Sequence, residues 1–77
     1  MKLGPKSFSR ILKSLRNAKK ISQEKLAELS GLDRSYVSLL ERGLRQPSLE
    51  TLFLIASALE ISPAEIVRKI EKDSNAD

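Results

Sequence analysis

The stretch Ser22–Gly43, SQEKLAELSGLDRSYVSLLERG, decides the fold, because its apolar residues have the spacing of two short helices joined by a tight turn. The residues that carry this period are Leu26, Ala27 and Leu29 before the turn and Val37 and Leu40 after it. Gly31 can adopt the positive φ that ends a helix. We expect Leu32 to fill the angle between the helices and Asp33 to accept hydrogen bonds from free N–H groups of the second helix. The stretch therefore predicts a helix-turn-helix.

Length and composition predict a single domain without catalytic chemistry. We place the domain at 1–77, with a core at about 7–70, the helix-turn-helix at about 23–42 and a frayed polar tail at 73–77. Cysteine and histidine are both missing, so we expect no disulfide, no metal site, no cofactor and no enzymatic activity. The sequence has neither the apolar core of a signal peptide nor a run of about eighteen apolar residues, which predicts a cytoplasmic chain without membrane contact.

Basic residues gather in the first part of the chain. From Met1 to Arg45 there are eleven Lys or Arg and four Asp or Glu, a balance of +7, whereas from Gln46 to Asp77 there are three and six, a balance of −3. A basic front that contains the helix-turn-helix indicates a protein that presents one face to phosphate. An ordinary lysine-rich surface is the alternative.

Helical periodicity accounts for nearly the whole sequence, and no alternating pattern is long enough for a strand, so we expect an all-α fold of five helices. The first helix should span Phe8–Ala18. Its inward stripe consists of Phe8, Ile11, Leu12 and Leu15. Ser22, Asp33 and Ser48 should cap the next three helices, and Ser62-Pro63-Ala64-Glu65 has the pattern of a capping box before the last.

The fourth helix, expected over Leu49–Leu59, is apolar on two sides. One side consists of Leu49, Leu52, Phe53, Ala56 and Leu59, and the other of Leu54 and Ala58. Because so small a domain can hardly bury both sides, we expect the second side to form a dimer surface with the last helix. The residues of this surface are Leu54, Ala58, Ile66, Val67 and Ile70. In the alternative, the last helix folds back and covers Leu54 within one subunit.

A wider set of residues resembles the phage repressor and Cro type of helix-turn-helix, often called XRE-like. The set is Gln23, Leu26, Ala27, Gly31, Ser35, Val37, Leu40, Glu41 and Gly43, followed by Pro47-Ser48-Leu49. Within that family, the run Leu32–Ser38 is similar to the controller proteins of restriction–modification systems, which are DNA-binding dimers. The resemblance spans about Phe8 to Ile70 and implies a compact five-helix repressor-like domain that binds double-stranded DNA. Family members usually have a glycine near Lys20, so its absence predicts a strained cap or a different turn.

The resemblance also implies which side chains meet DNA, because the second helix of this motif enters the major groove. The residues expected at base edges are Arg34, Ser35, Ser38 and Leu39, and those expected at phosphates are Gln23, Tyr36, Arg42, Arg45, Gln46 and Ser48. A guanidinium can bond guanine O6 and N7 together, which favours Arg34 for base readout over a phosphate contact. Leu39 could touch a thymine methyl or be an exposed leucine, and Tyr36 could instead pack on the scaffold.

The same resemblance implies an interior ion pair between Arg16 and Glu41, which would tie the first helix to the recognition helix. Our interpretation is a sequence-specific transcriptional regulator that acts as a homodimer on a two-fold operator, with half-sites about 34 Å apart. The sequence suggests no domain for a small-molecule effector, so we expect none. The main alternative is an antitoxin-like or other protein-interaction module that uses its apolar C-terminal surface.

Overall fold

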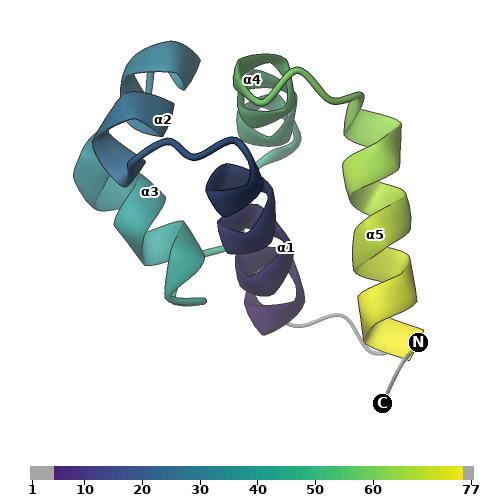
Figure 1. Cartoon of the computed structure of the whole chain (residues 1–77). Helices are drawn as coiled ribbons and strands as arrows, with labels where there is room; N and C mark the ends of the chain where they lie inside the picture. Colours follow the sequence, from purple (N-terminus) through teal and green to yellow (C-terminus); the bar gives the residue numbers. More distant parts are fainter. Residues whose placement is uncertain (1–4, 76–77) are drawn as a thin grey trace.

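The computed structural model describes residues 5–75, which form five α-helices (Figure 1). The helices are α1 Pro5–Ala18, α2 Gln23–Ser30, α3 Arg34–Glu41, α4 Leu49–Ala58 and α5 Pro63–Asn75. No strand occurs within the described range, and the predicted all-α class is confirmed. α1 begins about one turn earlier than predicted, at Pro5, because proline suits the first turn of a helix.

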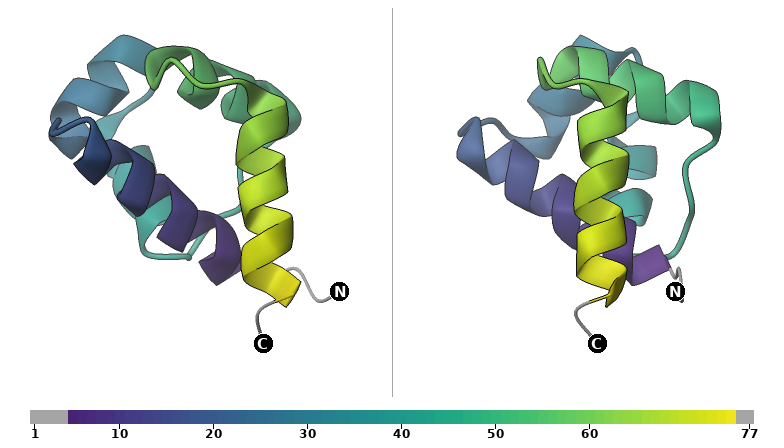
Figure 2. Two further views of the ribbon diagram at one scale, coloured as in Figure 1. Left: turned by 45° about the vertical axis from the view of Figure 1, so that its right-hand side comes forward. Right: turned by 90° about the vertical axis from the view of Figure 1, so that its right-hand side faces the viewer.

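The helices close around one core. α1 lies between α3 and α5 and packs against both, while α2 packs against α3 and α4 (Figure 1). α4 also contacts α5, and α1 and α5 converge at the end where α1 begins and α5 ends (Figure 2). This arrangement puts α2 and α3 on the side of α1 that is opposite to α5.

Every helix contributes to the core. Its buried members are Phe8, Leu12, Leu26, Ala27, Val37, Leu40, Leu52, Ile55, Ala56, Leu59 and Ile66. The predicted inward stripe of α1 is confirmed, because Phe8 and Leu12 are buried and Ile11 and Leu15 pack against the core. Removal of such apolar surface from water, at about 25 cal/mol per Å², is the main force that holds the helices together.

The prediction for the inward face of α4 is wrong in part. Leu49 and Phe53 were expected inside but are 73% and 54% exposed, whereas Ile55 is fully buried. Leu52, Ala56 and Leu59 are buried as expected, so the core-facing side is centred on these residues and Ile55. A helix that is apolar nearly all round gives no unique direction for its buried side, and packing against α2 and α5 decides it.

The first four helices end in the same way, with a residue at positive φ and a hydrogen bond from the next N–H back to the last turn. The four residues at positive φ are Lys20, Gly31, Gly43 and Glu60. The expected strained cap is confirmed for Lys20, whose φ is 59°, and Glu60 has a φ of 57°. For a residue other than glycine, the left-handed conformation is about 1–2 kcal/mol less favourable than the right-handed one.

Serine begins three of the helices as predicted. Ser22, Ser48 and Ser62 each accept a hydrogen bond from the backbone N–H three residues on, at 2.9–3.1 Å. The prediction for Asp33 is wrong in its chemistry. Its backbone is extended at the N-cap position of α3, but its side chain makes no capping hydrogen bond. The side chain is exposed, so water can solvate the carboxylate instead.

The predicted frayed tail is wrong for residues 73–75, which belong to α5, while residues 76–77 lie outside the described residues. Asp73 forms an ion pair with Arg10 of α1 at 2.6 Å, and the hydroxyl of Ser74 donates to that of Ser7 at 3.2 Å. Hydrogen bonds from Arg10 lower the pKa of Asp73 below its ordinary value. These contacts hold the end of α5 against the start of α1. They could not be predicted from the apolar period of the sequence, because they join polar residues of two helices.

Residues 5–75 contain no helix with the length and apolar character needed to cross a membrane. The same residues contain no group of acidic side chains arranged to hold a metal ion.

Candidate nucleic-acid interface

The helix-turn-helix consists of α2, α3 and the turn between them. Gly31 has a φ of 75°, and the N–H of Leu32 donates to the carbonyl of Ala27 at 3.0 Å, which ends α2. Leu32 is half-buried and packs against the core. A Cβ at position 31 would meet no atom within 4 Å, so the turn needs glycine for its backbone conformation and not for space.

α3 turns one face to the core and leaves the other accessible. The inner face consists of the buried residues Val37, Leu40 and Glu41. Of the residues expected at base edges, Ser35, Ser38 and Leu39 lie on the other side of the helix, whereas Arg34 lies in its first turn, in line with Val37 and Glu41. Arg34 and Ser35 are exposed in the first turn, and the other two are half-buried. Tyr36 is half-buried and packs against the core, so it has the scaffold contact that was the alternative to a phosphate contact.

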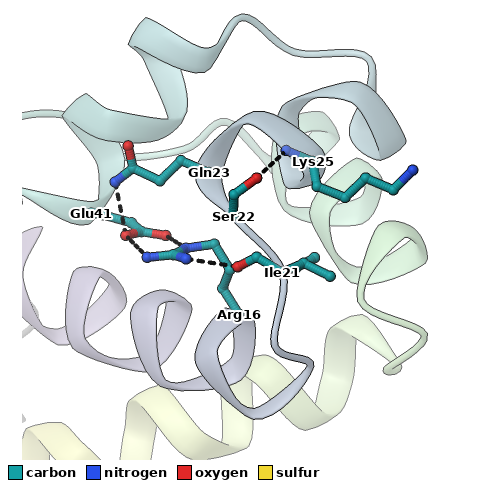
Figure 3. Close-up of polar contacts among 6 residues, drawn as sticks. All are labelled: Arg16, Ile21, Ser22, Gln23, Lys25 and Glu41. Atoms are coloured by element: carbon teal, nitrogen blue, oxygen red, sulfur yellow. Dashed lines mark hydrogen bonds and ion pairs between the residues drawn. The ribbon is translucent and has the colours of Figure 1, made fainter.

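A buried ion pair fixes α3 to α1 (Figure 3). Arg16 Nε donates to one carboxylate oxygen of Glu41 at 2.5 Å and Nη2 to the other at 3.0 Å. The side chains are 14% and 1% exposed. The hydrogen bonds with Glu41 raise the pKa of Arg16, so the guanidinium stays charged. Two parallel hydrogen bonds fix the angle between the helices as well as their separation.

Gln23 joins the same network and thereby connects the start of α2 to the end of α3. Its Nε2 donates to Glu41 Oε1 at 3.1 Å, while Arg16 Nη1 donates to the carbonyl of Ile21 at 2.8 Å (Figure 3). The sequence assigned Gln23 to a phosphate and did not foresee this inward hydrogen bond. The second N–H of the amide stays available, so the inward bond leaves room for a phosphate contact.

Further polar side chains border α3 around Gly43 and the start of α4. Four residues expected at phosphates, Arg42, Arg45, Gln46 and Ser48, are all exposed. The Ser48 hydroxyl also donates to the Thr51 hydroxyl at 2.9 Å, so a phosphate would have to replace that bond. Gly43 has a φ of 74°, and a Cβ there would lie 3.2 Å from Cγ of Lys6. The turn after α3 is therefore pressed against the start of α1.

The five residues expected in a dimer surface do not all lie on the outside. Ile66 is fully buried in the core, so its assignment to the surface is wrong, because α5 turns this residue toward α1 and α4. Ala58 and Ile70 are half-buried and pack against the core, whereas Leu54 and Val67 are 41% and 50% exposed. The alternative in which α5 covers Leu54 is therefore also wrong.

An apolar groove lies beside Val67, and we call it the α4–α5 groove. It has a volume of about 340 Å³ and is lined by Phe8, Gln46, Pro47, Leu52, Val67 and Ile70. Leu49 and Phe53 are exposed on the same helix as Leu52. The apolar period of the sequence predicts both residues in the core and so does not indicate that they add to this surface.

Comparison with known proteins identifies the family. A family model described as helix-turn-helix matches residues 12–66. Over 58 residues the chain is 41% identical to the control protein C.SmaI of Serratia marcescens, a match that covers 75% of this chain and 69% of that protein. The structure is similar to that of the restriction-modification controller protein C.AhdI from Aeromonas hydrophila, with 52% identity, a TM-score of 0.78 and coverage of 80% of this chain and 94% of that one.

A second solved structure contains DNA. It is the restriction-modification controller protein C.Esp1396I, solved as a tetramer in complex with its natural 35 base-pair operator. The match has 35% identity and a TM-score of 0.82, and covers 90% of this chain and 91% of that one. The chain therefore belongs to the helix-turn-helix family and is a DNA-binding transcriptional regulator.

Proposed function

We propose that this protein controls transcription in the cytoplasm as a homodimer on a two-fold symmetric operator, in the manner of a restriction–modification controller. The observation that carries the proposal is that α3 is accessible at one end and held rigidly at the other. Its first turn is exposed, while its far end is fixed to α1 by the buried pair of Arg16 and Glu41. A recognition helix needs this combination of accessible side chains and a rigid mount.

The exposed face of α3 would read the bases. Arg34 can donate two hydrogen bonds to one guanine, and the short side chains of Ser35 and Ser38 let the helix approach the groove floor. Leu39 is half-buried at the side of this face, where a thymine methyl could reach it. Sequence preference would therefore come mainly from these four residues.

Residues on both flanks of α3 would hold the phosphates. The set is Gln23, Tyr36, Arg42, Arg45, Gln46 and Ser48. Gln23 lies at the start of α2 and Ser48 at the start of α4, where the free N–H groups of a helix N-terminus also favour an anion. Such contacts supply affinity and register without sequence information.

The α4–α5 groove supports a dimer of identical subunits. Its lining is free of charged side chains, and exposed Val67 lies at its edge. Leu54, Leu49 and Phe53 add exposed apolar area on α4, which a second copy could cover. Two recognition helices related by a two-fold axis would then enter major grooves about 34 Å apart.

Selection of bound sequences from random duplexes tests the proposal directly, and two arginine variants separate base from phosphate contacts. Arg34→Ala should lose roughly 1–3 kcal/mol on the selected site and relax the preference at one base pair per half-site. Arg45→Ala is the matched control, which should weaken the selected and random duplexes alike and reduce the salt slope by about one per subunit. Enrichment of no sequence would overturn the proposal, and equal weakening of both duplexes by Arg34→Ala would remove Arg34 from base readout.

A further inference from the structure

A second groove runs along the outer side of α1 and α5, apart from the exposed face of α3 and from the α4–α5 groove. One part, of about 340 Å³, is lined by Ile11, Ser14, Leu15, Lys69, Lys72 and Asp73. The other part, of about 300 Å³, is lined by Leu15, Ala18, Lys19, Leu59, Glu60 and Ile61. Because both parts share Leu15, we treat them as one surface, the α1–α5 groove. Along α1 it extends from Ile11 to Lys19, about 12 Å.

The groove has an apolar floor and a rim with unbalanced charge. Ile11 and Leu15 are half-buried in the floor. Two acidic residues on the rim are already neutralised, because Asp73 pairs with Arg10 at 2.6 Å and Glu60 with Lys19 at 2.8 Å. In both pairs, the hydrogen bond from the basic partner lowers the pKa of the carboxyl, so both carboxyls stay ionised and paired at neutral pH.

Two lysines on the rim have no such partner. Among residues 5–75, the side chain of neither Lys69 nor Lys72 forms a hydrogen bond or an ion pair. Both belong to α5, three residues apart, so they lie on the same side of that helix. The rim therefore carries two uncompensated positive charges beside an apolar floor.

The two flanks of α5 suit different occupants. Val67 and Ile70 line the uncharged α4–α5 groove, whereas Lys69 and Lys72 line the α1–α5 groove. In a two-fold contact each patch meets an identical patch, so a second copy on the α1–α5 groove would bring lysines close to lysines. Charge thus favours an acidic partner over a second copy at this groove.

We propose that the α1–α5 groove binds an acidic amphipathic helix of another protein. The apolar face of that helix would cover Ile11 and Leu15, and its carboxylates would meet Lys69 and Lys72. α1 separates this groove from α3, so the partner could bind while the exposed face of α3 is on DNA (Figure 1). The groove would thus give an operator-bound subunit a contact to a second protein.

Binding of designed helical peptides to the full chain tests this proposal. The probe is a fluorescent peptide of about 14 residues with leucines on one helical face and glutamates on the rest. One control peptide has the same composition in scrambled order, and another has lysine in place of glutamate. Fluorescence anisotropy should show binding of the probe that is at least about tenfold tighter than that of either control peptide.

Two charge reversals locate the site. Lys72→Glu should weaken the probe about tenfold, whereas Lys13→Glu, which makes the same charge change on α1 outside the groove, should change its affinity less than about twofold. Both lysines are exposed, so both variants should fold and keep operator affinity within about threefold, which a duplex titration on the same samples checks. In NMR spectra, the largest changes in amide chemical shift on adding the probe should occur at Ser14, Leu15 and Lys69.

Several results would overturn the proposal. If the scrambled peptide binds as tightly as the probe, binding depends on net charge and not on an amphipathic helix. If Lys72→Glu and Lys13→Glu weaken the probe equally, the probe does not bind in the groove. Shifts centred on Val67 would move the peptide to the α4–α5 groove. Laurate offers an apolar chain and one carboxylate, and binding of laurate as tight as that of the probe would make the occupant a small amphiphile. Displacement of the probe by a DNA duplex would make the surface part of the DNA interface.

Discussion

Glu41 is a carboxylate that the fold keeps out of water, with a side chain only 1% exposed. Three donors meet it, two from Arg16 and one from Gln23. Buried charge is tolerated only when it is paired and hydrogen-bonded, so these donors are a condition for placing Glu41 on the inner face of α3. The same donors prevent an acidic residue on the recognition helix from facing phosphate.

Glu41→Ala should therefore destabilise the domain by about 3–5 kcal/mol, because it leaves the guanidinium of Arg16 partly buried and unpaired. Urea unfolding followed by circular dichroism measures the loss. The matched control is Glu28→Gln, which breaks an exposed ion pair with Lys25 and should change stability by less than about 1 kcal/mol. A loss for Glu41→Ala as small as that of the control would contradict a stabilising role of the pair.

Lys20 holds a left-handed conformation at the end of α1, where glycine would carry no steric cost. Lys20→Gly should stabilise the domain by about 0.5–1 kcal/mol, since relief of the strained φ outweighs the extra freedom of glycine in the unfolded chain. Lys13→Gly is the same change in the middle of α1 and should destabilise it by about 1 kcal/mol. Thermal melts of both variants measure these changes in stability. If both variants are destabilised, the turn is not strained by the lysine.

At the level of the elements, the five helices could be predicted because residues close in sequence determine where each helix begins and ends. Serine caps, the glycine after α2 and the apolar period of α3 each depend on neighbours within a turn or two. The inward face of α4 could not be predicted in full, because Phe53 and Ile55 are equally apolar and only packing separates them. The inward hydrogen bond of Gln23 and the contacts of Asp73 also join residues far apart in sequence, which periodicity does not record.

The contact between the ends of α1 and α5 should make stability depend on pH. Because Arg10 lowers the pKa of Asp73 in the folded state, the pair contributes stability above the ordinary Asp pKa of about 3.9, and that contribution is lost as pH falls through the lowered value. Asp73→Asn should therefore lower the melting temperature at about pH 7, by a small amount since Arg10 is mostly exposed, and the difference from the parent should shrink as pH falls through the lowered pKa of Asp73.

A double-variant comparison checks the partner. In the Arg10→Gln background, Asp73→Asn should cost less stability than in the parent, because the ion pair that it removes is already broken. A difference between Asp73→Asn and the parent that stays constant with pH would show that the carboxylate charge does not contribute to the loss.

For the whole molecule, a substitution that separates the two subunits should also weaken DNA binding. Val67→Glu would place two like charges in or near an apolar contact between subunits, so the dimer should dissociate and the affinity for a two-fold operator should fall at least about tenfold. A single subunit would keep Arg34 and its phosphate contacts but lose the second half-site. Sedimentation and a duplex titration on the same samples measure both effects.

Leu29→Glu is the control for this prediction, because Leu29 is an apolar residue on α2 that is exposed to the same extent as Val67, 50%. It should leave the dimer intact. A Val67→Glu protein that stays dimeric, or a monomer that binds the two-fold site as tightly as the parent, would exclude the α4–α5 groove as the subunit interface.

The meeting of α1 and α5 at one end of the domain also has a mechanical consequence. A pulling force applied through positions 5 and 75 acts where the two helices are closest (Figure 2). It would peel them apart from that end, so the Ser7–Ser74 and Arg10–Asp73 contacts would carry the load first. Tethers attached at these two positions would therefore measure the strength of the contact between α1 and α5.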